Sequence, residues 1–322
     1  LDQNLQRNQP NAMSEFNLIK HYFTRPAQDT DLGVGDDAAL IRVQAGHQLA
    51  ISADMVVEGT HFLANCPAFD IGWKSLAVNV SDMAAMGASP KWATLAIALP
   101  EENEDWLAEF SRGFFACADT FGISLIGGDT TRGPLNICVQ IMGEIPTGSA
   151  LRRDGAKVND EIWVSGTLGM AALGLASLQG KLALNSDEKN ECIRALQRPQ
   201  TRVELGLALR HVAHSAIDIS DGLLADLGHI LKLSKVGATL DWKAIPKLSI
   251  EKMIDATTLQ EATLGGGDDY ELCFTAPESA HEQIIEIGKK LNIQLSCIGV
   301  TQQEHGLHVL DGDQPLEIKK AG

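Results

Sequence analysis

Aromatic residues and long apolar runs are scarce in this chain. Only 5% of its 322 residues are aromatic while 44% are hydrophobic, a balance typical of soluble globular proteins rich in small aliphatic side chains. The longest apolar run, residues 168–178, is shorter than the roughly 20 residues that a membrane-spanning helix requires. Residues 1–20 also lack the apolar segment of a secretory signal peptide. These absences argue against a membrane protein, and the length is sufficient for two domains.

Cysteine motifs and excess positive charge are absent as well. The six cysteines form no C-x-x-C motif and no close pair, a spacing typical of reduced thiols in the cytoplasm, where we expect the protein to act. Lys and Arg total 26 against 42 Asp and Glu, so the formal net charge is −16. Such a charge argues against nonspecific binding to nucleic acid or to an anionic membrane. An acidic chain that binds a phosphorylated ligand must therefore neutralise it locally, through metal ions or a few well-placed arginines.

The most familiar phosphate-binding motifs are also missing. Residues 174–181 (GLASLQGK) resemble a P-loop, but five residues separate the glycines instead of four, and Leu182 replaces the hydroxyl residue. Residues 33–38 fit the spacing of a dinucleotide-binding turn, but two aspartates stand where a pyrophosphate needs bare N–H groups. His211 and His214 lack the further ligands of a zinc site. We therefore expect none of these three sites.

Acidic residues beside glycine or serine are the most informative feature that is present. Carboxylates are ligands that hard cations such as Mg²⁺ prefer, and glycine lets a phosphate or metal approach the backbone closely. A single Gly-Asp or Ser-Asp pair is more often a turn or a helix cap than part of a catalytic site. Six such clusters occur in this chain: Asp36-Asp37, Asp54, Asp82, Asp129, Asp218 with Asp221, and Asp268-Asp269.

Two of these clusters are difficult to explain as ordinary turns. Asp82 falls inside a predicted helix beside its apolar stripe, where a carboxylate requires a cation or a hydrogen-bond donor. Asp218 and Asp221 follow an apolar strand, the position at which α/β proteins place ligands. With the other four clusters they favour one shared metal–phosphate site. The adjacent Arg152 and Arg153 are candidates for binding phosphate, with a solvated charge pair as the equally open alternative.

Hydrophobic periodicity predicts alternating strands and helices in two halves. In the first half we expect strands at 37–43, 47–52, 91–99, 123–126 and 137–145, and helices at 71–86, capped by Asp70, and at 102–121. In the second half we expect strands at 161–165, 216–219, 270–275 and 295–300, and helices at 168–178, 203–212, 223–234 and 280–291. A turn-rich segment separates the halves. The predicted units are a disordered extension or tag remnant at 1–12, an N-terminal ATP- and metal-binding domain at 13–148, and a C-terminal domain at 149–322.

Seven motifs in a fixed order carry a resemblance to a known family. They are GVGDDA at 33–38, SAD at 52–54, GTHF at 59–62, NVSDMAAMG at 79–87, GGDTTRG at 127–133, AIDISDGL at 216–223 and GGDDYEL at 266–272. No single motif is specific, but the ordered set closely resembles the thiamine-monophosphate kinases. That family lies in the superfamily of aminoimidazole ribonucleotide synthetase and selenophosphate synthetase.

The resemblance implies a fold, a reaction and a set of site residues. The fold would be the two-domain α/β (α+β) fold of aminoimidazole ribonucleotide synthetase, with mixed sheets and flanking helices, in a homodimer that binds ATP near the subunit interface. The reaction would be direct in-line transfer of the ATP γ-phosphoryl group to thiamine monophosphate, which depends on positioning and on several Mg²⁺ ions and needs no catalytic side chain. The matching motifs assign Mg²⁺ ligands to Asp37, Ser52, Ala53, Asp54, Asp82, Asp129, Asp218 and Asp221, ATP contacts to Gly128, Arg153 and Ser220, and substrate contacts to His61 and Asp268.

Three departures from the family pattern concern this site. Ala53 replaces a hydroxyl residue, so a metal contact there must come from a backbone oxygen. Asp268 replaces the common Glu and is one methylene shorter. The family also places an aromatic residue near its C-terminus against the thiamine rings, whereas no Phe, Trp or Tyr follows Phe274. We expect that contact to be missing or replaced.

Two alternative functions stay open at this point. The chain could be another ATP-using member of the superfamily, such as a purine-pathway cyclo-ligase or a selenide-phosphorylating enzyme. The latter normally carries a reactive cysteine near its N-terminus, and no cysteine precedes Cys66 here. The chain could also be a nucleotide-binding scaffold or carbamoyl-transfer partner without kinase turnover, although the intact carboxylate set argues against a loss of metal chemistry.

Overall fold

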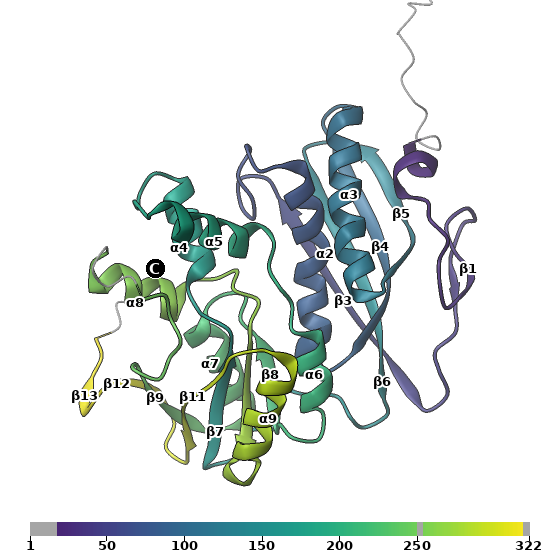
Figure 1. The fold of residues 1–322 in the computed structure, drawn as a ribbon. Helices are drawn as coiled ribbons and strands as arrows, with labels where there is room; N and C mark the ends of the chain where they lie inside the picture. Colours follow the sequence, from purple (N-terminus) through teal and green to yellow (C-terminus); the bar gives the residue numbers. More distant parts are fainter. Residues whose placement is uncertain (1–17, 250–253, 318–322) are drawn as a thin grey trace, which may run out of the picture.

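Two β-sheets with covering helices lie side by side in the computed structural model, which describes residues 18–249 and 254–317 (Figure 1). The first sheet has the strand order β3-β6-β4-β5, and the second has the order β13-β12-β9-β11-β7-β10-β8. Each sheet combines antiparallel neighbours with one parallel pair, β4 with β5 and β9 with β12. Both sheets are therefore mixed, as expected. The predicted extension at 1–12 lies outside the described residues.

The first sheet is covered on one face by two long helices. Its strands are β3 (His47–Val57), β4 (Ser89–Leu99), β5 (Ser124–Arg132) and β6 (Asn136–Pro146), and its helices are α2 (Ala68–Ala85) and α3 (Glu104–Phe121). A Cβ at Gly113 of α3 would lie 1.9 Å from Phe69 O, and one at Gly72 of α2 would lie 2.1 Å from Phe110 O. The two helices can approach this closely only because both positions are glycine.

The second sheet is built from the remaining strands and has helices on both faces. Its strands are β7 (Asp160–Ser165), β8 (Ser215–Asp218), β9 (Gly237–Asp241), β10 (Leu272–Pro277), β11 (Leu295–Gln302), β12 (Leu307–Asp311) and β13 (Gln314–Pro315). The helices are α4 (Met170–Leu178), α5 (Ser186–Gln197), α6 (Val203–Leu209), α7 (Leu223–Ser234), α8 (Ala256–Gly265) and α9 (His281–Leu291). Short elements complete the chain: η1 (Ile19–Phe23), β1 (Thr30–Leu32), β2 (Leu40–Ile41) and η2 (Glu278–Ala280).

Helix α2 joins the two halves of the molecule. It packs on β3 and β6 of the first sheet and also contacts α6 and β8 of the second half. A Cβ at Gly206 of α6 would lie 2.0 Å from Ala84 O, so α6 also rests directly on the α2 backbone. One hydrophobic core consequently runs from Leu76 of α2 to Trp163 and Phe274 of the second sheet.

Several sequence-based expectations differ from the structure. The strand expected at 37–43 is reduced to β2, because Asp36 and Asp37 belong to a turn. Helix α2 begins earlier than expected, at Ala68, so Asp70 lies in its first turn and pairs with Arg198 instead of capping it. The glycines at 127–128 lie within β5, although we expected the strand to end before them. Hydrophobic periodicity did not predict the helices α5 and α8 or the strands β1, β9, β12 and β13.

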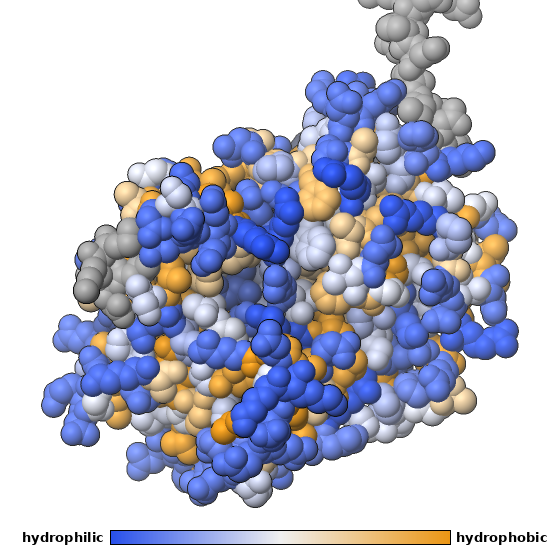
Figure 2. Space-filling model, in the orientation of Figure 1, coloured by the Kyte–Doolittle hydropathy of each residue, from blue (hydrophilic) through white to orange (hydrophobic). Residues whose placement is uncertain are grey.

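Hydrophilic side chains cover much of the visible surface, including the region over α9 (Figure 2). Helix α9 is strongly amphipathic, with Ile284 in the core and Glu282, Glu286 and Lys289 outward. Among the helices within 18–249 and 254–317, none is both long enough and apolar enough to cross a membrane.

Candidate functional site

A first cavity of about 570 Å³ lies along β4 and β5 of the first sheet. Gly128, with a φ of 149°, forms part of its wall, and a Cβ there would lie 1.8 Å from Leu95 O. Only glycine fits this position, because a side chain there would collide with the backbone of β4, so the cavity wall at this point is bare backbone. Asp129 follows directly, and its carboxylate is exposed.

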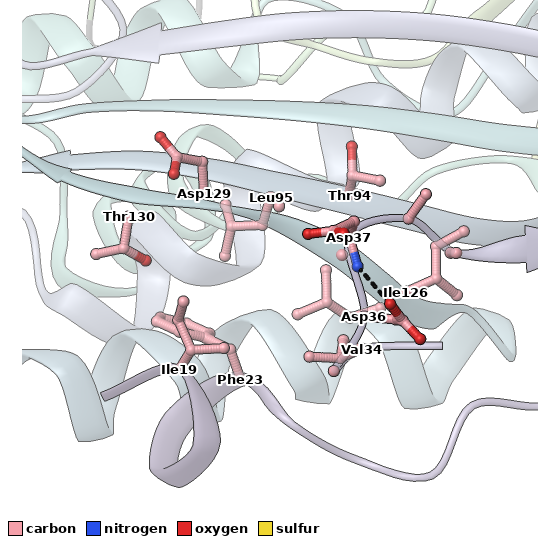
Figure 3. A pocket seen from close by; sticks show the side chains of 16 residues that line it. Ile19, Phe23, Val34, Asp36, Asp37, Thr94, Leu95, Ile126, Asp129 and Thr130 are labelled. Atoms are coloured by element: carbon pink, nitrogen blue, oxygen red, sulfur yellow. Dashed lines mark hydrogen bonds between the residues drawn. The ribbon is translucent and has the colours of Figure 1, made fainter. Parts of the chain in front are cut away.

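The turn at 35–38 also lines this cavity (Figure 3). Asp37 N donates a hydrogen bond to Asp36 Oδ1 at 3.0 Å, which fixes the turn locally. Ile19 and Phe23 of η1 supply an apolar side to the same cavity. The cavity therefore combines an apolar wall with exposed carboxylates, an arrangement that suits a ligand with one flat apolar end and one anionic end held through cations.

A second cavity of about 450 Å³ lies between the two halves of the molecule, and five aspartates are among the residues that line it. Asp54 reaches it from β3, Asp82 from α2 and Asp218 from the end of β8. These residues are far apart in the sequence, and α2 brings them together because it contacts both sheets. The lining also includes Ser220, Asp221, His61 and Asp268.

The carboxylates in this cavity disturb one another. Burial, with the neighbouring Asp82 charge, raises the pKa of Asp54 to about 6. Burial, again with the Asp82 charge, raises the pKa of Asp218 to about 7. Carboxylates held this close favour a bound cation, which would restore their charged forms. Their oxygens are the donors that Mg²⁺ prefers, so the residues present fit that ion.

Neutral side chains hold the carboxylates in place. Ser52 Oγ donates to Asp82 Oδ2 at 2.5 Å, and the buried Ser81 Oγ donates to Asp218 Oδ2 at 2.7 Å. The fully buried Asn79 accepts a hydrogen bond from Asp54 N at 3.1 Å. The motif at 79–82 therefore contributes two supporting residues besides Asp82 itself.

Lys74 is a buried cation that the sequence reasoning missed. It is 4% exposed, and its Nζ lies 3.2 Å from Asp268 Oδ1 and donates to His61 O at 3.1 Å. Tyr270 OH donates to the same Asp268 oxygen at 3.1 Å. A signal was present, because Lys74 stands eight residues before Asp82 and thus on the same face of the helix. Asp268 is consequently held by two donors from different elements.

A small compartment of about 80 Å³ adjoins the second cavity at His61 and Asp268. Four leucines contribute to its walls: Leu63, Leu175 and Leu178, with Leu196 from α5. No aromatic side chain other than Phe62 contributes among the described lining residues. It is therefore an apolar space beside a polar one.

The predicted site residues are distributed as follows. Asp37, Gly128 and Asp129 line the first cavity, while Asp54, Asp82, Asp218, Asp221, Ser220, His61 and Asp268 line the second. Ser52 joins the second set through Asp82, whereas Ala53 and Arg153 line neither cavity. The Ala53 side chain points to the exposed face of β3, and Arg153 is exposed while Arg152 pairs with Asp154. Five of the predicted aspartates thus share one cavity, although no group of three or more His, Cys, Asp or Glu side chains in 18–249 and 254–317 already stands at metal-ligand spacing.

Comparison with known protein families gives a consistent result. Residues 35–145 match the AIR synthase related protein N-terminal domain, and residues 157–312 match the corresponding C-terminal domain. The thiamine-monophosphate kinase of Salmonella typhimurium is 45% identical over 318 residues, which cover 97% of this chain and 98% of that protein. That of Escherichia coli K12 is 43% identical over 317 residues, with 97% and 98% covered.

Solved structures agree with the sequence relatives. The thiamine-monophosphate kinase of Stenotrophomonas maltophilia K279a superposes with a TM-score of 0.83 at 49% identity, covering 88% of this chain and 91% of that one. The structure described as AaThiL complexed with AMPPCP and TMP gives a TM-score of 0.75 at 30% identity, with 89% and 90% covered. E. coli HypE, a hydrogenase maturation protein, has a TM-score of 0.75 at 22% identity, which shows the shared fold alone. The two-domain fold expected from the sequence is thus confirmed, and the chain belongs to the thiamine-monophosphate kinase family of AIR synthase related proteins.

Proposed function

We propose that this chain transfers the γ-phosphoryl group of ATP to the phosphate of thiamine monophosphate, giving thiamine diphosphate and ADP. The observation that carries the proposal is the second cavity, in which Asp54, Asp82 and Asp218 converge from three elements beside the anchored Asp268. A phosphorylated ligand can enter so acidic a cavity only with cations, and phosphoryl transfer is the chemistry that uses this combination. Relatives named for this activity, and a relative in complex with AMPPCP and TMP, support the choice of substrates.

We assign ATP to the first cavity and the acceptor phosphate to the second. The apolar side at Ile19 and Phe23 would receive the base, and the bare backbone at Gly128 would receive phosphate oxygens. Ser220 and Asp221, at the rim of the second cavity, would meet the far end of the triphosphate. Arg153 has no place in this assignment, because it lines neither cavity.

Magnesium is the cation that the carboxylates fit. Asp37 and Asp129 would hold it at the first cavity, and Asp54, Asp82, Asp218 and Asp221 at the second. Bound Mg²⁺ supplies charge neutralisation between two phosphate groups that otherwise repel. Ser52 would act by orienting Asp82, to which it donates a hydrogen bond, and not as a direct ligand. The acceptor phosphate is already ionised near neutral pH, so no general base is required.

The thiamine end of the substrate would enter the aliphatic compartment. His61 and Asp268 line both spaces, so a ligand can pass from one to the other at these residues. Leu63, Leu175 and Leu178 then offer apolar contact to the rings where the family uses an aromatic side chain.

We further propose a homodimer formed through the open face of the first sheet. Ile51 and Met55 on β3 are 57% and 53% exposed, with Ala53 between them on the same face. An apolar strand face of this kind is normally buried against a partner, and a second copy supplies a matching one. ATP bound along β4 and β5 would then lie close to that interface. Light scattering should show a dimer, and Ile51→Asp should yield a monomer; a monomeric wild-type chain contradicts this assembly.

A coupled ADP-release assay tests the reaction. Purified protein with ATP and Mg²⁺ should turn over only when thiamine monophosphate is added, and direct product analysis should show thiamine diphosphate. Absence of that dependence refutes the proposal. A purine-pathway acceptor or selenide in the same assay tests the alternative superfamily activities, and ATP binding without turnover on any acceptor would indicate a scaffold. The cytoplasm stays the predicted compartment.

Two charge-removing variants test the metal assignment. Asp82→Asn and Asp129→Asn each remove one carboxylate charge from a different cavity, and each should lower turnover by roughly two orders of magnitude or more, as expected for the loss of one electrostatic contact in the transition state. Asp119→Asn is the matched control, because Asp119 is exposed and pairs with Arg25 at the surface. Near-normal activity in both site variants would show that the assignment is wrong.

A further inference from the structure

One buried aspartate outside both cavities shapes the loop that follows β8. Asp226, in the first turn of α7, is 3% exposed. Its Oδ2 accepts hydrogen bonds from the backbone N–H groups of Ser220, Asp221 and Gly222, at 3.0, 2.9 and 3.1 Å. Within the described ranges no basic side chain forms an ion pair with it. A carboxylate at this depth is stable only because the three N–H groups share its charge, so carboxylate and loop hold each other in place.

The loop held by Asp226 is locked to a second loop, residues 266–270. Asp268 N donates to Ser220 O at 2.9 Å, and Tyr270 N donates to Ile219 O at 2.8 Å. A Cβ at Gly267 would lie 2.5 Å from Ser220 O, so the backbones touch without intervening side chains. A displacement of the first loop must therefore displace the second.

The second loop depends on such support because its backbone is strained. Tyr270 has a φ of 51°, in the left-handed region that residues other than Gly, Asn and Asp rarely adopt, and Asp268 beside it has a φ of 68° in the same region. Strained residues of this kind persist only where surrounding contacts over-determine them. Two of those contacts are the carbonyls of Ile219 and Ser220, which belong to the segment that Asp226 organises.

We propose that Asp226 is a positioning residue that couples the two substrate sites: it holds residues 220–222 toward the nucleotide and, through them, residues 266–270 toward the acceptor, while touching neither ligand. The identity of the two ligands rests on the proposed function. The coupling itself rests on the hydrogen bonds from three N–H groups to one carboxylate oxygen and on the backbone contacts between the loops.

The test compares Asp226→Asn with Asp160→Asn. Asp160 is also 3% exposed and accepts a backbone hydrogen bond, from Lys157 N at 2.8 Å, but it lies at the start of β7 away from both cavities. Affinities for a Mg²⁺-bound, non-hydrolysable ATP analogue and for thiamine monophosphate are measured by calorimetry, with both variants well below their own Tm. Asp226→Asn should weaken both affinities on the order of tenfold, as for lost supporting contacts at ligand sites, while Asp160→Asn should leave both unchanged.

Hydrogen exchange provides a readout that does not depend on the reaction. In Asp226→Asn the amides of residues 220–222 and also those of Asp268 and Tyr270 should exchange faster than in Asp160→Asn. Normal exchange at 268 and 270 would overturn the coupling, and affinities equal to those of Asp160→Asn would overturn the positioning role. If the wild-type chain does not use thiamine monophosphate, the proposed function fails, but the exchange pattern still decides the role of Asp226.

Discussion

The buried ion pair between Arg202 and Glu271 offers a quantitative test of what holds the second loop in place. The two side chains are 18% and 10% exposed, and the guanidinium binds both carboxylate oxygens, with Nε–Oε2 at 2.6 Å and Nη2–Oε1 at 2.5 Å. Ser165 Oγ adds a third hydrogen bond to Glu271 at 2.5 Å. Glu271 stands next to Tyr270, and its carbonyl accepts a hydrogen bond from Ile219 N, so the ion pair anchors the C-terminal end of the second loop, residues 266–270.

Glu271→Ala should destabilise the protein strongly. Removal of one partner from a buried pair costs about 3–5 kcal/mol, because the other charge stays buried without compensation. Since Arg202 keeps some contact with water, we take the lower end, about 3 kcal/mol. In a folding unit of about 150–250 residues, a loss of 1 kcal/mol lowers the Tm by about 2–4 °C, so a loss of about 3 kcal/mol should lower the Tm by about 6–12 °C. Differential scanning calorimetry measures it directly.

A double variant separates the charge effect from lost packing. Arg202→Met with Glu271→Leu removes both charges and keeps apolar volume, so its Tm should lie closer to the wild type than that of Glu271→Ala. Gly166→Ala provides an independent disturbance, because a Cβ there would lie 2.0 Å from Glu271 Oε1. A decrease below about 2 °C in Glu271→Ala, or a double variant less stable than the single one, would refute the reasoning.

Three further predictions address the packing, the thiols and the substrate compartment. Gly113→Ala should destabilise by about 1–3 kcal/mol in urea unfolding, because its Cβ meets Phe69 O at 1.9 Å, whereas Gly228→Ala, with open space around it in α7, should be neutral or stabilising. Burial raises the pKa of Cys66 and Cys192 to about 11. Labelling of these two thiols in the native protein at pH 8 should therefore be on the order of a hundredfold slower than labelling of a free cysteine, and it should accelerate as the pH rises. Fast labelling of either thiol would contradict its burial. Leu178→Ala should raise the KM for thiamine monophosphate by roughly tenfold, because it removes apolar contact from the thiamine rings, and it should leave the KM for ATP unchanged. An equal rise in both KM values would show that the thiamine rings bind elsewhere.

Local patterns in the sequence were sufficient where local physics decides the structure. The apolar spacing of α2 and α3 predicted both helices to within a few residues, because helix burial repeats every three to four positions. Apolar spacing did not predict α8, because apolar and polar residues are not clearly segregated on that helix. It also did not predict the short strands β12 and β13, because their positions depend on pairing with other strands.

The sequence by itself determined the family and the chemistry, because the ordered carboxylate and glycine motifs are readable one after another along the chain. Only the tertiary structure decided which carboxylates lie together. Asp37 and Asp129 line the first cavity, while Asp54, Asp82 and Asp218 line the second. It also revealed the contacts of Lys74, for which the sequence offered only the spacing from Asp82, and those of Asp226, which does not stand out from its neighbours in the sequence. The reason is physical, since the role of a buried charge is set by the atoms that surround it. Those around Lys74 come from distant segments that meet at α2, and those around Asp226 come from the preceding loop once it folds back onto the helix.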